Sequence, residues 1–170
     1  MEKIAVDAMG GDFAPLEIVL GSIQAVREFK IPVVLVGDKE QILTILKNNH
    51  EENNPLIEIH HASEVIEMGE HPGLAYRKKK DASVSVGARL VRAKECGALV
   101  APGSTGAAVT AGLLGIGRIK GIERPAILTP IPNEKGRYTY LIDSGASAQP
   151  KVETYVQNAI LGLSLIHISE

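Results

Sequence analysis

The stretch over residues 3–15, KIAVDAMGGDFAP, decides how the fold begins. Residues 3–7 form a short apolar run that ends in an acid, which is typical of a buried strand. Gly10 and Gly11 then turn the chain, and Pro15 suits the first position of a helix. Apolar side chains follow at helical spacing as far as Phe29. The stretch therefore predicts a strand, a glycine turn and a helix.

The rest of the chain repeats this alternation. Apolar runs predict strands at residues 32–36, 56–60 and 98–101, and two more at 126–131 and 138–143 around a turn at 133–136. Helices are predicted after a cap at Asp38, near Pro72, over residues 83–94 with Gly97 as the stop, over 105–116, and from near Val152. Near-continuous apolar strands between helices favour an α/β fold with a largely parallel sheet.

Ligands of such sheets bind beyond the carboxyl ends of the strands. The glycine turns after Asp7, Ala101 and Asp143 all follow predicted strands, so we expect them to converge.

Composition excludes several classes of protein. The chain has 170 residues, enough for one domain at about 150 residues each, and is 45% apolar and 22% charged. These values exclude a disordered, collagen-like or disulfide-scaffold protein. A net charge of −2 and the absence of Trp argue against a nucleic-acid partner. A single cysteine, Cys96, fits a reducing compartment, and no signal or membrane segment is visible, so we expect a cytoplasmic protein.

The turn at residues 7–12, DAMGGD, has two interpretations. It is a tight turn with an aspartate cap, or Gly10 and Gly11 free backbone N–H groups to form an anion nest. Asp7 and Asp12 would repel a bare phosphate, so they would instead orient the turn or bind a ligand hydroxyl or ammonium.

The turn at residues 102–106, PGSTG, follows a strand and opens a helix. Gly103 and Gly106 free the backbone, Ser104 and Thr105 supply hydroxyls, and a helix N-terminus supplies positive potential, which together suit an anion. The alternative is simple helix capping by Ser104 or Thr105. The turn matches neither a P-loop nor a dinucleotide fingerprint.

Two further clusters carry polar chemistry. Four consecutive cations form either a solvated face or a contact for phosphate or an acidic partner: Arg77, Lys78, Lys79 and Lys80. Asp143, before the turn at Gly145, is a base, a hydrogen-bond anchor or a cap. His60 and His61 alternate faces on a strand, and no His or Cys spacing makes a metal site.

These motifs, in this order and spacing, resemble the PlsX family over roughly residues 1–160. They are MEKIAVDAMGGDFAP, the run GLAYRKKKDAS, GALVAPGSTGAAVTAGLLGIGRIKGIERPAI and LIDSGA. Members are bacterial phosphate acyltransferases of phospholipid synthesis. The resemblance implies that inorganic phosphate attacks the thioester of a long-chain acyl–acyl carrier protein, giving acyl phosphate and free carrier protein. It also implies a Rossmann-like three-layer α/β/α fold, a homodimer, peripheral association with the inner membrane surface, and no metal or cofactor.

Roles follow from this chemistry. Phosphate is itself the nucleophile, so the enzyme must supply a phosphate cradle and donors to the developing oxyanion. The resemblance places the cradle at Gly103, Ser104, Thr105 and Gly106. Further substrate contacts are expected from Gly10, Gly11, Asp12 and Gly145, catalytic roles from Asp7 and Asp143, and phosphate or carrier-protein contacts from the four cations.

The chain departs from the family in three ways. Members are about twice as long, so residues 1–162 are expected to be the N-terminal part of a single phosphate acyltransferase domain, truncated here and not necessarily active. Residues 163–170, LSLIHISE, are expected to be a non-family tail, as a frameshift or read-through would produce. After Ala146 the family reads Asn-x-Asp, where this chain has Ser147-Ala148-Gln149.

Two alternatives stay open from the sequence. A phosphotransacetylase-like enzyme would use a coenzyme A thioester, and a non-catalytic module would only bind phosphate or carrier protein. A nicotinamide-dependent dehydrogenase would need a cofactor fingerprint that the sequence lacks.

Overall fold

The computed structural model describes residues 2–146 and 149–169. The chain divides into two compact units, Met1–Gly117 and Arg118–Glu170.

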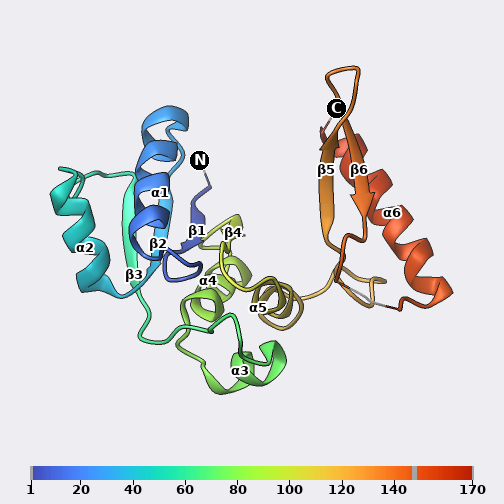
Figure 1. The fold of residues 1–170 in the computed structure, drawn as a ribbon, viewed down its shortest axis with the longest axis horizontal. Coiled ribbons are helices and arrows are strands. Elements are labelled where there is room, and N and C mark those ends of the chain that lie inside the picture. The colour runs from blue at the N-terminus through green and yellow to red at the C-terminus, as the bar shows by residue number, and fades with distance from the viewer. Residues whose placement is uncertain (1, 147–148, 170) are drawn as a thin grey trace. The chain divides into compact units, whose positions relative to one another are not determined.

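A parallel sheet forms the centre of the first unit (Figure 1). Its strands lie in the order β3-β2-β1-β4. Their bounds are β1 Ile4–Asp7, β2 Val33–Gly37, β3 Ile57–His61 and β4 Ala98–Val100. In the register of the central strand, Val6 pairs with Leu35 on one side and with Val100 on the other. The predicted parallel sheet is thus confirmed, and the carboxyl ends of β1 and β4 come together.

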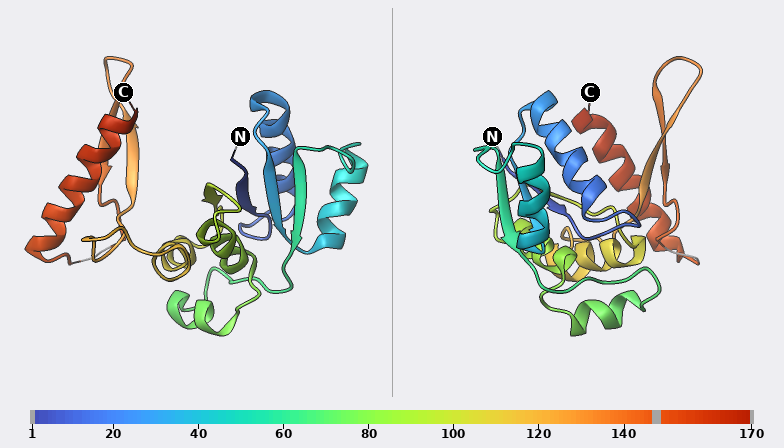
Figure 2. Two further views of the ribbon diagram at one scale, coloured as in Figure 1. Left: turned by 180° about the vertical axis from the view of Figure 1, so that it is seen from behind. Right: turned by 60° about the vertical axis from the view of Figure 1, so that its left-hand side comes forward.

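Helices cover both faces of this sheet (Figures 1 and 2). Side chains alternate between the faces along each strand. One face packs against α1 (Leu16–Phe29) and α2 (Lys39–Asn48), and the other packs against α4 (Ser83–Arg92). The first core contains Val6, Val19, Ile23, Leu35 and Ile42, and the second contains Ala5, Val34, Val36, Val86, Leu90 and Cys96. This is the three-layer, Rossmann-like α/β/α arrangement that the resemblance implied.

A third core of small residues joins α4 to α3 (Pro72–Lys78), α5 (Thr105–Thr110) and η1 (Ala111–Ile116). A Cβ on Gly115 would lie only 2.6 Å from the Cβ of Ala88, so the helices approach closely. The sequence predicted one helix over residues 105–116; the structure instead changes from α-helical to π-helical hydrogen bonding at Ala111. The apolar spacing does not distinguish these two forms over so short a segment.

Two capping predictions have different outcomes. Asp38 caps α2 as predicted, because its Oδ1 accepts a hydrogen bond from the Gln41 N–H at 2.9 Å. Gly97 was wrongly predicted to stop the helix that begins at residue 83. That helix ends at Arg92, and Lys94 takes the left-handed conformation, with φ 62°. Gly97 instead donates its N–H to the Lys3 carbonyl at 2.8 Å, beside β4.

The second unit contains an antiparallel hairpin and a helix. The hairpin pairs β5 (Leu128–Pro132) with β6 (Tyr138–Ile142), and the helix is α6 (Val152–Ser169). Asn133 holds the hairpin turn by accepting N–H hydrogen bonds from Lys135 and Arg137. The two strands were predicted, but they form a sheet of their own and do not extend the parallel sheet. The helix includes residues 163–169 of the stretch that was predicted to be a non-family tail.

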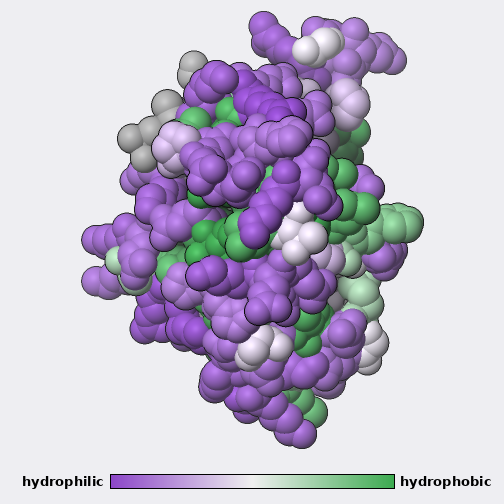
Figure 3. Space-filling view, turned by 90° about the vertical axis from the view of Figure 1, so that its left-hand side faces the viewer, coloured by the Kyte–Doolittle hydropathy of each residue, from purple (hydrophilic) through white to green (hydrophobic). Residues whose placement is uncertain are grey.

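The side of the first unit that carries α2 is largely hydrophilic, with small hydrophobic patches between the polar side chains (Figure 3). Within residues 2–146 and 149–169, no helix has the length and apolar character needed to cross a membrane.

Candidate functional site

Two glycine loops cross at the carboxyl ends of β1 and β4. A Cβ built on Gly10 would lie 2.9 Å from the backbone N of Gly103, and one on Gly103 would lie 3.0 Å from the Cα of Gly10. Gly11 has φ +105° and approaches the Pro102 carbonyl. We call these four residues, Gly10, Gly11, Pro102 and Gly103, the glycine crossing. Two of the three turns that were expected to converge therefore meet.

The carboxylate of Asp7 lies directly under the glycine crossing. The residue is only 4% exposed, and a Cβ on Gly10 would come within 2.8 Å of its Oδ2. Its Oδ1 accepts the Met9 N–H at 3.1 Å. Burial raises the pKa of Asp7 above its ordinary value, outweighing hydrogen bonds from the Ser83 hydroxyl and from the Met9 and Gly10 N–H groups, which lower it. Of the interpretations left open by the sequence, this placement favours orienting the turn.

The raised pKa of Asp7 gives the fold a pH dependence. Because the folded chain binds this proton more tightly than the unfolded chain, the free energy of unfolding falls as pH rises from the ordinary pKa through the raised one. An Asp7→Asn variant has no such proton. In urea denaturation at several pH values, the stability of the wild type relative to this variant should therefore decline across that window. A difference that is constant or grows with pH would contradict this assignment.

The second loop also begins α5. Ser104 caps the helix, because its Oγ accepts the Ala107 N–H at 3.4 Å, whereas Thr105 is exposed at the first helical position. Gly106 is needed for packing, since its Cβ would lie 2.5 Å from Cγ of Pro72 at the start of α3. The capping interpretation of Ser104 is therefore confirmed. The cap lies at the N-terminal end of α5, which also carries the first-turn N–H groups.

The four consecutive cations have different surroundings. Lys79 is bound within the fold, with its Nζ 2.6 Å from Glu70 Oε2 and 2.7 Å from the Val65 carbonyl. The Lys80 Nζ lies 5.9 Å from the ring centroid of Tyr76. Arg77 and Lys78 are exposed. A ligand would contact Arg77, Lys78 and Lys80 more readily than Lys79, whose ion pair it would have to break.

Asp143 organises its own turn in the second unit. Its Oδ1 accepts N–H groups from Ile127 at 2.9 Å, Ala146 at 3.0 Å and Gly145 at 3.3 Å, and Gly145 has φ +137°. This geometry favours the hydrogen-bond anchor among the three interpretations of Asp143. The departures from the family at Ser147 and Ala148 lie outside the described residues. Convergence of this turn with the glycine crossing stays a prediction, as do the substrate contacts of Gly145 and of Asp12, which is exposed beside the first loop.

The comparison with known proteins decides the family. The chain matches the family described as fatty acid synthesis protein over residues 2–167. The chain belongs to this family. The resemblance drawn from the four motifs is thereby confirmed.

Curated relatives in the fatty acid synthesis protein family are named phosphate acyltransferase. The chain is 50% identical over 162 residues to the one from Desulfitobacterium hafniense strain Y51, covering 95% of this chain and 48% of the relative. It is 49% identical over 160 residues to the one from Pelotomaculum thermopropionicum, covering 94% and 46%. The Aquifex aeolicus relative is 47% identical over 162 residues, covering 95% and 48%. The chain spans about half the length of the curated relatives it matches.

Sequence analysis of this family member missed a pair of buried serines at the start of α4. Ser83 is 1% exposed and Ser85 is 2% exposed. The Ser85 hydroxyl donates to the Lys79 carbonyl at 3.2 Å, and the Ser83 hydroxyl is among the groups that lower the pKa of Asp7. Serines at a helix start ordinarily indicate capping, so the sequence carried no separate signal for these contacts.

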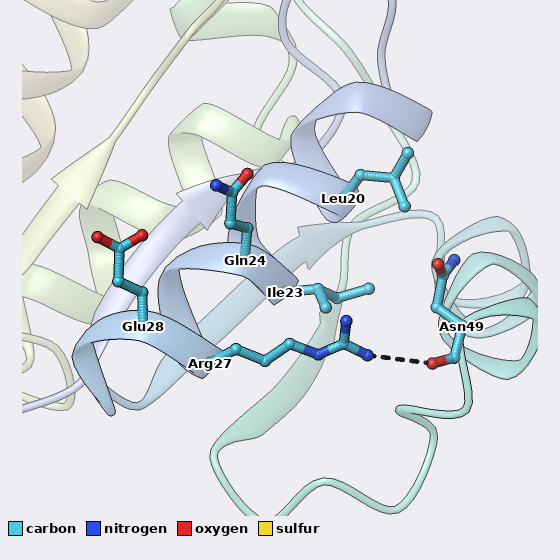
Figure 4. A pocket seen from close by; sticks show the side chains of 6 residues that line it. All are labelled: Leu20, Ile23, Gln24, Arg27, Glu28 and Asn49. Atoms are coloured by element: carbon cyan, nitrogen blue, oxygen red, sulfur yellow. Dashed lines mark hydrogen bonds between the residues drawn. The ribbon is translucent and has the colours of Figure 1, made fainter.

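Hollows also lie elsewhere in the first unit. One, of about 500 Å³, lies between α1 and α2 (Figure 4). Its cation, Arg27, points toward the Asn49 carbonyl and is also 2.6 Å from the Glu51 carboxylate, so an anion would compete with these two acceptors. Another, of about 340 Å³, is mainly apolar and includes Ile18, Val100 and Pro102 among its lining residues. No cluster of three potential metal ligands occurs among the described residues.

Proposed function

We propose that this chain supplies the phosphate-binding part of a phosphate acyltransferase of phospholipid synthesis. The substrates would be a long-chain acyl–acyl carrier protein and inorganic phosphate, and the products acyl phosphate and free carrier protein. The observation that carries the proposal is the glycine crossing beside the start of α5. It occurs in a chain that is 50% identical, over 162 residues, to a protein named phosphate acyltransferase.

The crossing suits phosphate because its surface is backbone. Gly10 and Gly103 leave no side chain between a ligand and the main chain, and the first-turn N–H groups of α5 have no helical partner of their own. A phosphate oxygen would attack the thioester carbonyl carbon, the carbon–sulfur bond would break, and the carrier thiolate would leave and take up a proton. Phosphate is ionised near neutral pH, so Asp7 need not act as a base.

The partners follow from the same proposal. Three of the four cations are exposed and would contact an acidic carrier protein: Arg77, Lys78 and Lys80. Lys79 instead stabilises the segment through its ion pair with Glu70. Homodimeric assembly and a cytoplasmic location at the inner membrane surface belong to the proposal through the family resemblance. The membrane-surface location suits a product, acyl phosphate, that is consumed at the membrane.

The Ser104→Ala/Thr105→Ala variant tests the cradle. The assay uses a hybrid in which this chain replaces the matching half of the Desulfitobacterium relative, with acyl phosphate trapped by hydroxylamine. Loss of hydroxyls that contact a charged ligand should raise the phosphate KM about tenfold or more. An unchanged phosphate KM would show that this loop does not form the phosphate cradle.

Two controls sharpen the assay. Thr44→Ala removes an exposed hydroxyl that bonds the Glu40 carbonyl in α2, and should leave the phosphate KM unchanged. Acyl–coenzyme A should react more slowly than acyl–acyl carrier protein. A preference for the coenzyme A thioester would contradict the carrier-protein part of the proposal.

A further inference from the structure

We propose that Lys79 is a positioning residue for the loop at residues 102–106, which it reaches through Pro72 at the start of α3. Lys79 holds the segment at residues 63–81 in its folded shape, and that shape sets where Pro72 packs. The consequence for phosphate binding rests on the proposed function. The link from Lys79 to the loop does not.

The 63–81 segment is a loop whose two ends are fixed together. Asp81 Oδ2 accepts the Ser63 N–H at 2.9 Å and the Ser63 hydroxyl at 2.6 Å. In return, Glu64 Oε2 accepts the Asp81 N–H at 3.1 Å, and the Glu64 N–H donates to the Asp81 carbonyl at 3.2 Å. Because the ends are closed in this way, a few contacts inside the loop can determine its shape.

Lys79 makes such contacts from within the loop. Its Nζ lies 2.6 Å from Glu70 Oε2 and 2.7 Å from the Val65 carbonyl oxygen. The same Glu70 oxygen accepts the Glu67 N–H at 2.9 Å. The Lys79 and Glu70 side chains are only 28% and 35% exposed, so solvent screens the pair less than it screens a fully exposed one.

The ion pair links the two ends of α3. Lys79 is the C-cap residue of this helix, and Glu70 directly precedes its N-cap, His71. The helix can therefore neither tilt nor separate from residues 65–70 while the pair is intact. Pro72, the first residue of α3, is positioned by this arrangement.

Pro72 in turn packs against the loop at residues 102–106. A Cβ on Gly106 would lie 2.5 Å from Cγ and 3.2 Å from Cβ of Pro72. The same added Cβ would lie 3.8 Å from the hydroxyl oxygen of Ser104, so Gly106 lies between the proline ring and the cap. A shift of Pro72 would therefore move the loop or remove its support on this side.

A direct contact of Lys79 with phosphate would predict the opposite effect of Glu70. If Lys79 left Glu70 to bind the ligand, removing the Glu70 carboxylate would free the ammonium group and strengthen phosphate binding. If Lys79 acts through Pro72, removing Glu70 breaks the same link and weakens phosphate binding, although the chain loses a negative charge. The sign of the Glu70 effect therefore separates the two roles.

The test measures two quantities on the whole chain by NMR: the amide shifts of Gly103, Thr105 and Gly106 without ligand, and the affinity for inorganic phosphate. Lys79→Met and Glu70→Ala should each move these amide signals and weaken phosphate binding about three- to tenfold. The double variant should bind within about twofold of the weaker single variant, because both residues act through one contact. Lys79→Arg keeps a charged donor and should retain most of the affinity.

Lys3→Met is the matched control. The Lys3 Nζ lies 2.5 Å from Glu58 Oε2, so this variant makes the same change of charge and also loses an ion pair. Lys3 precedes β1, at the end of the strand opposite the glycine crossing, and its removal should change neither quantity. Equal effects of Lys3→Met and Lys79→Met, or tighter phosphate binding by Glu70→Ala, would overturn the inference.

Two variants cover the case in which Lys79→Met does not fold. Glu70→Ala leaves Lys79 its bond to the Val65 carbonyl, and Pro72→Ala removes only the ring carbons that pack on Gly106. Unmoved loop amides in either variant would overturn the inference. If the wild type does not bind phosphate, the proposed function fails, while the amide shifts of the ligand-free variants still decide the role of Lys79.

Discussion

Gly10→Ala is expected to lower the free energy of unfolding by about 1–3 kcal/mol, the usual range for overpacking, and to abolish phosphate binding. The new methyl group would lie 2.8 Å from Asp7 Oδ2, 2.9 Å from the Gly103 N and 3.0 Å from the Gly103 Cα. Two of these atoms are backbone and the third is a buried carboxylate, so the two loops must separate. Urea denaturation measures the first effect and phosphate titration the second.

Gly21→Ala is the matched control for this substitution. Gly21 lies within α1, and apart from its chain neighbours and the backbone of its own helix, no atom lies within 4 Å of the added Cβ. The change should stabilise the chain by up to about 1 kcal/mol, because alanine is the better helix former, and should leave phosphate binding intact. Similar behaviour of the two variants would contradict the close approach of the loops.

Leu35→Ala should have the largest effect on stability, a loss of about 2–5 kcal/mol. Leu35 is 0% exposed on the inner strand β2, in the core between the sheet and helices α1 and α2. Truncation removes buried methyl groups and leaves a cavity that rigid strands on either side cannot close. The measurement is the midpoint of urea denaturation at constant slope.

Leu74→Ala provides the comparison, because Leu74 is 55% exposed on α3. Its loss should be below about 0.5 kcal/mol, as for most surface changes. Losses of similar size for the two leucines would contradict the assignment of the sheet and its helix-covered faces.

The elements of the first unit could be predicted because their signals are local. The strand that ends at Asp7 and the strand that begins at Val33 are continuous apolar runs, and Asp38 caps the following helix through its own side chain. Gly97 misled the prediction because a glycine after a helix is a frequent stop. Here Lys94 takes the left-handed conformation instead.

The site was predictable only in part. The glycine loops could be placed together because adjacent parallel strands end at the same edge of a sheet. The burial of Asp7 and the ion pair of Lys79 with Glu70 depend on how separate elements pack. Nothing in the local sequence distinguishes Lys79 from its three cationic neighbours, so those contacts could not be predicted.

The most direct test of the central claim, that the glycine crossing binds phosphate, is a titration of the ¹⁵N-labelled chain with inorganic phosphate. The account predicts saturable shifts of the Gly10, Gly11, Gly103 and Thr105 amides that report one affinity. Shifts confined to Arg77 and Lys78, with the crossing unmoved, would contradict it, and so would the absence of any saturable shift.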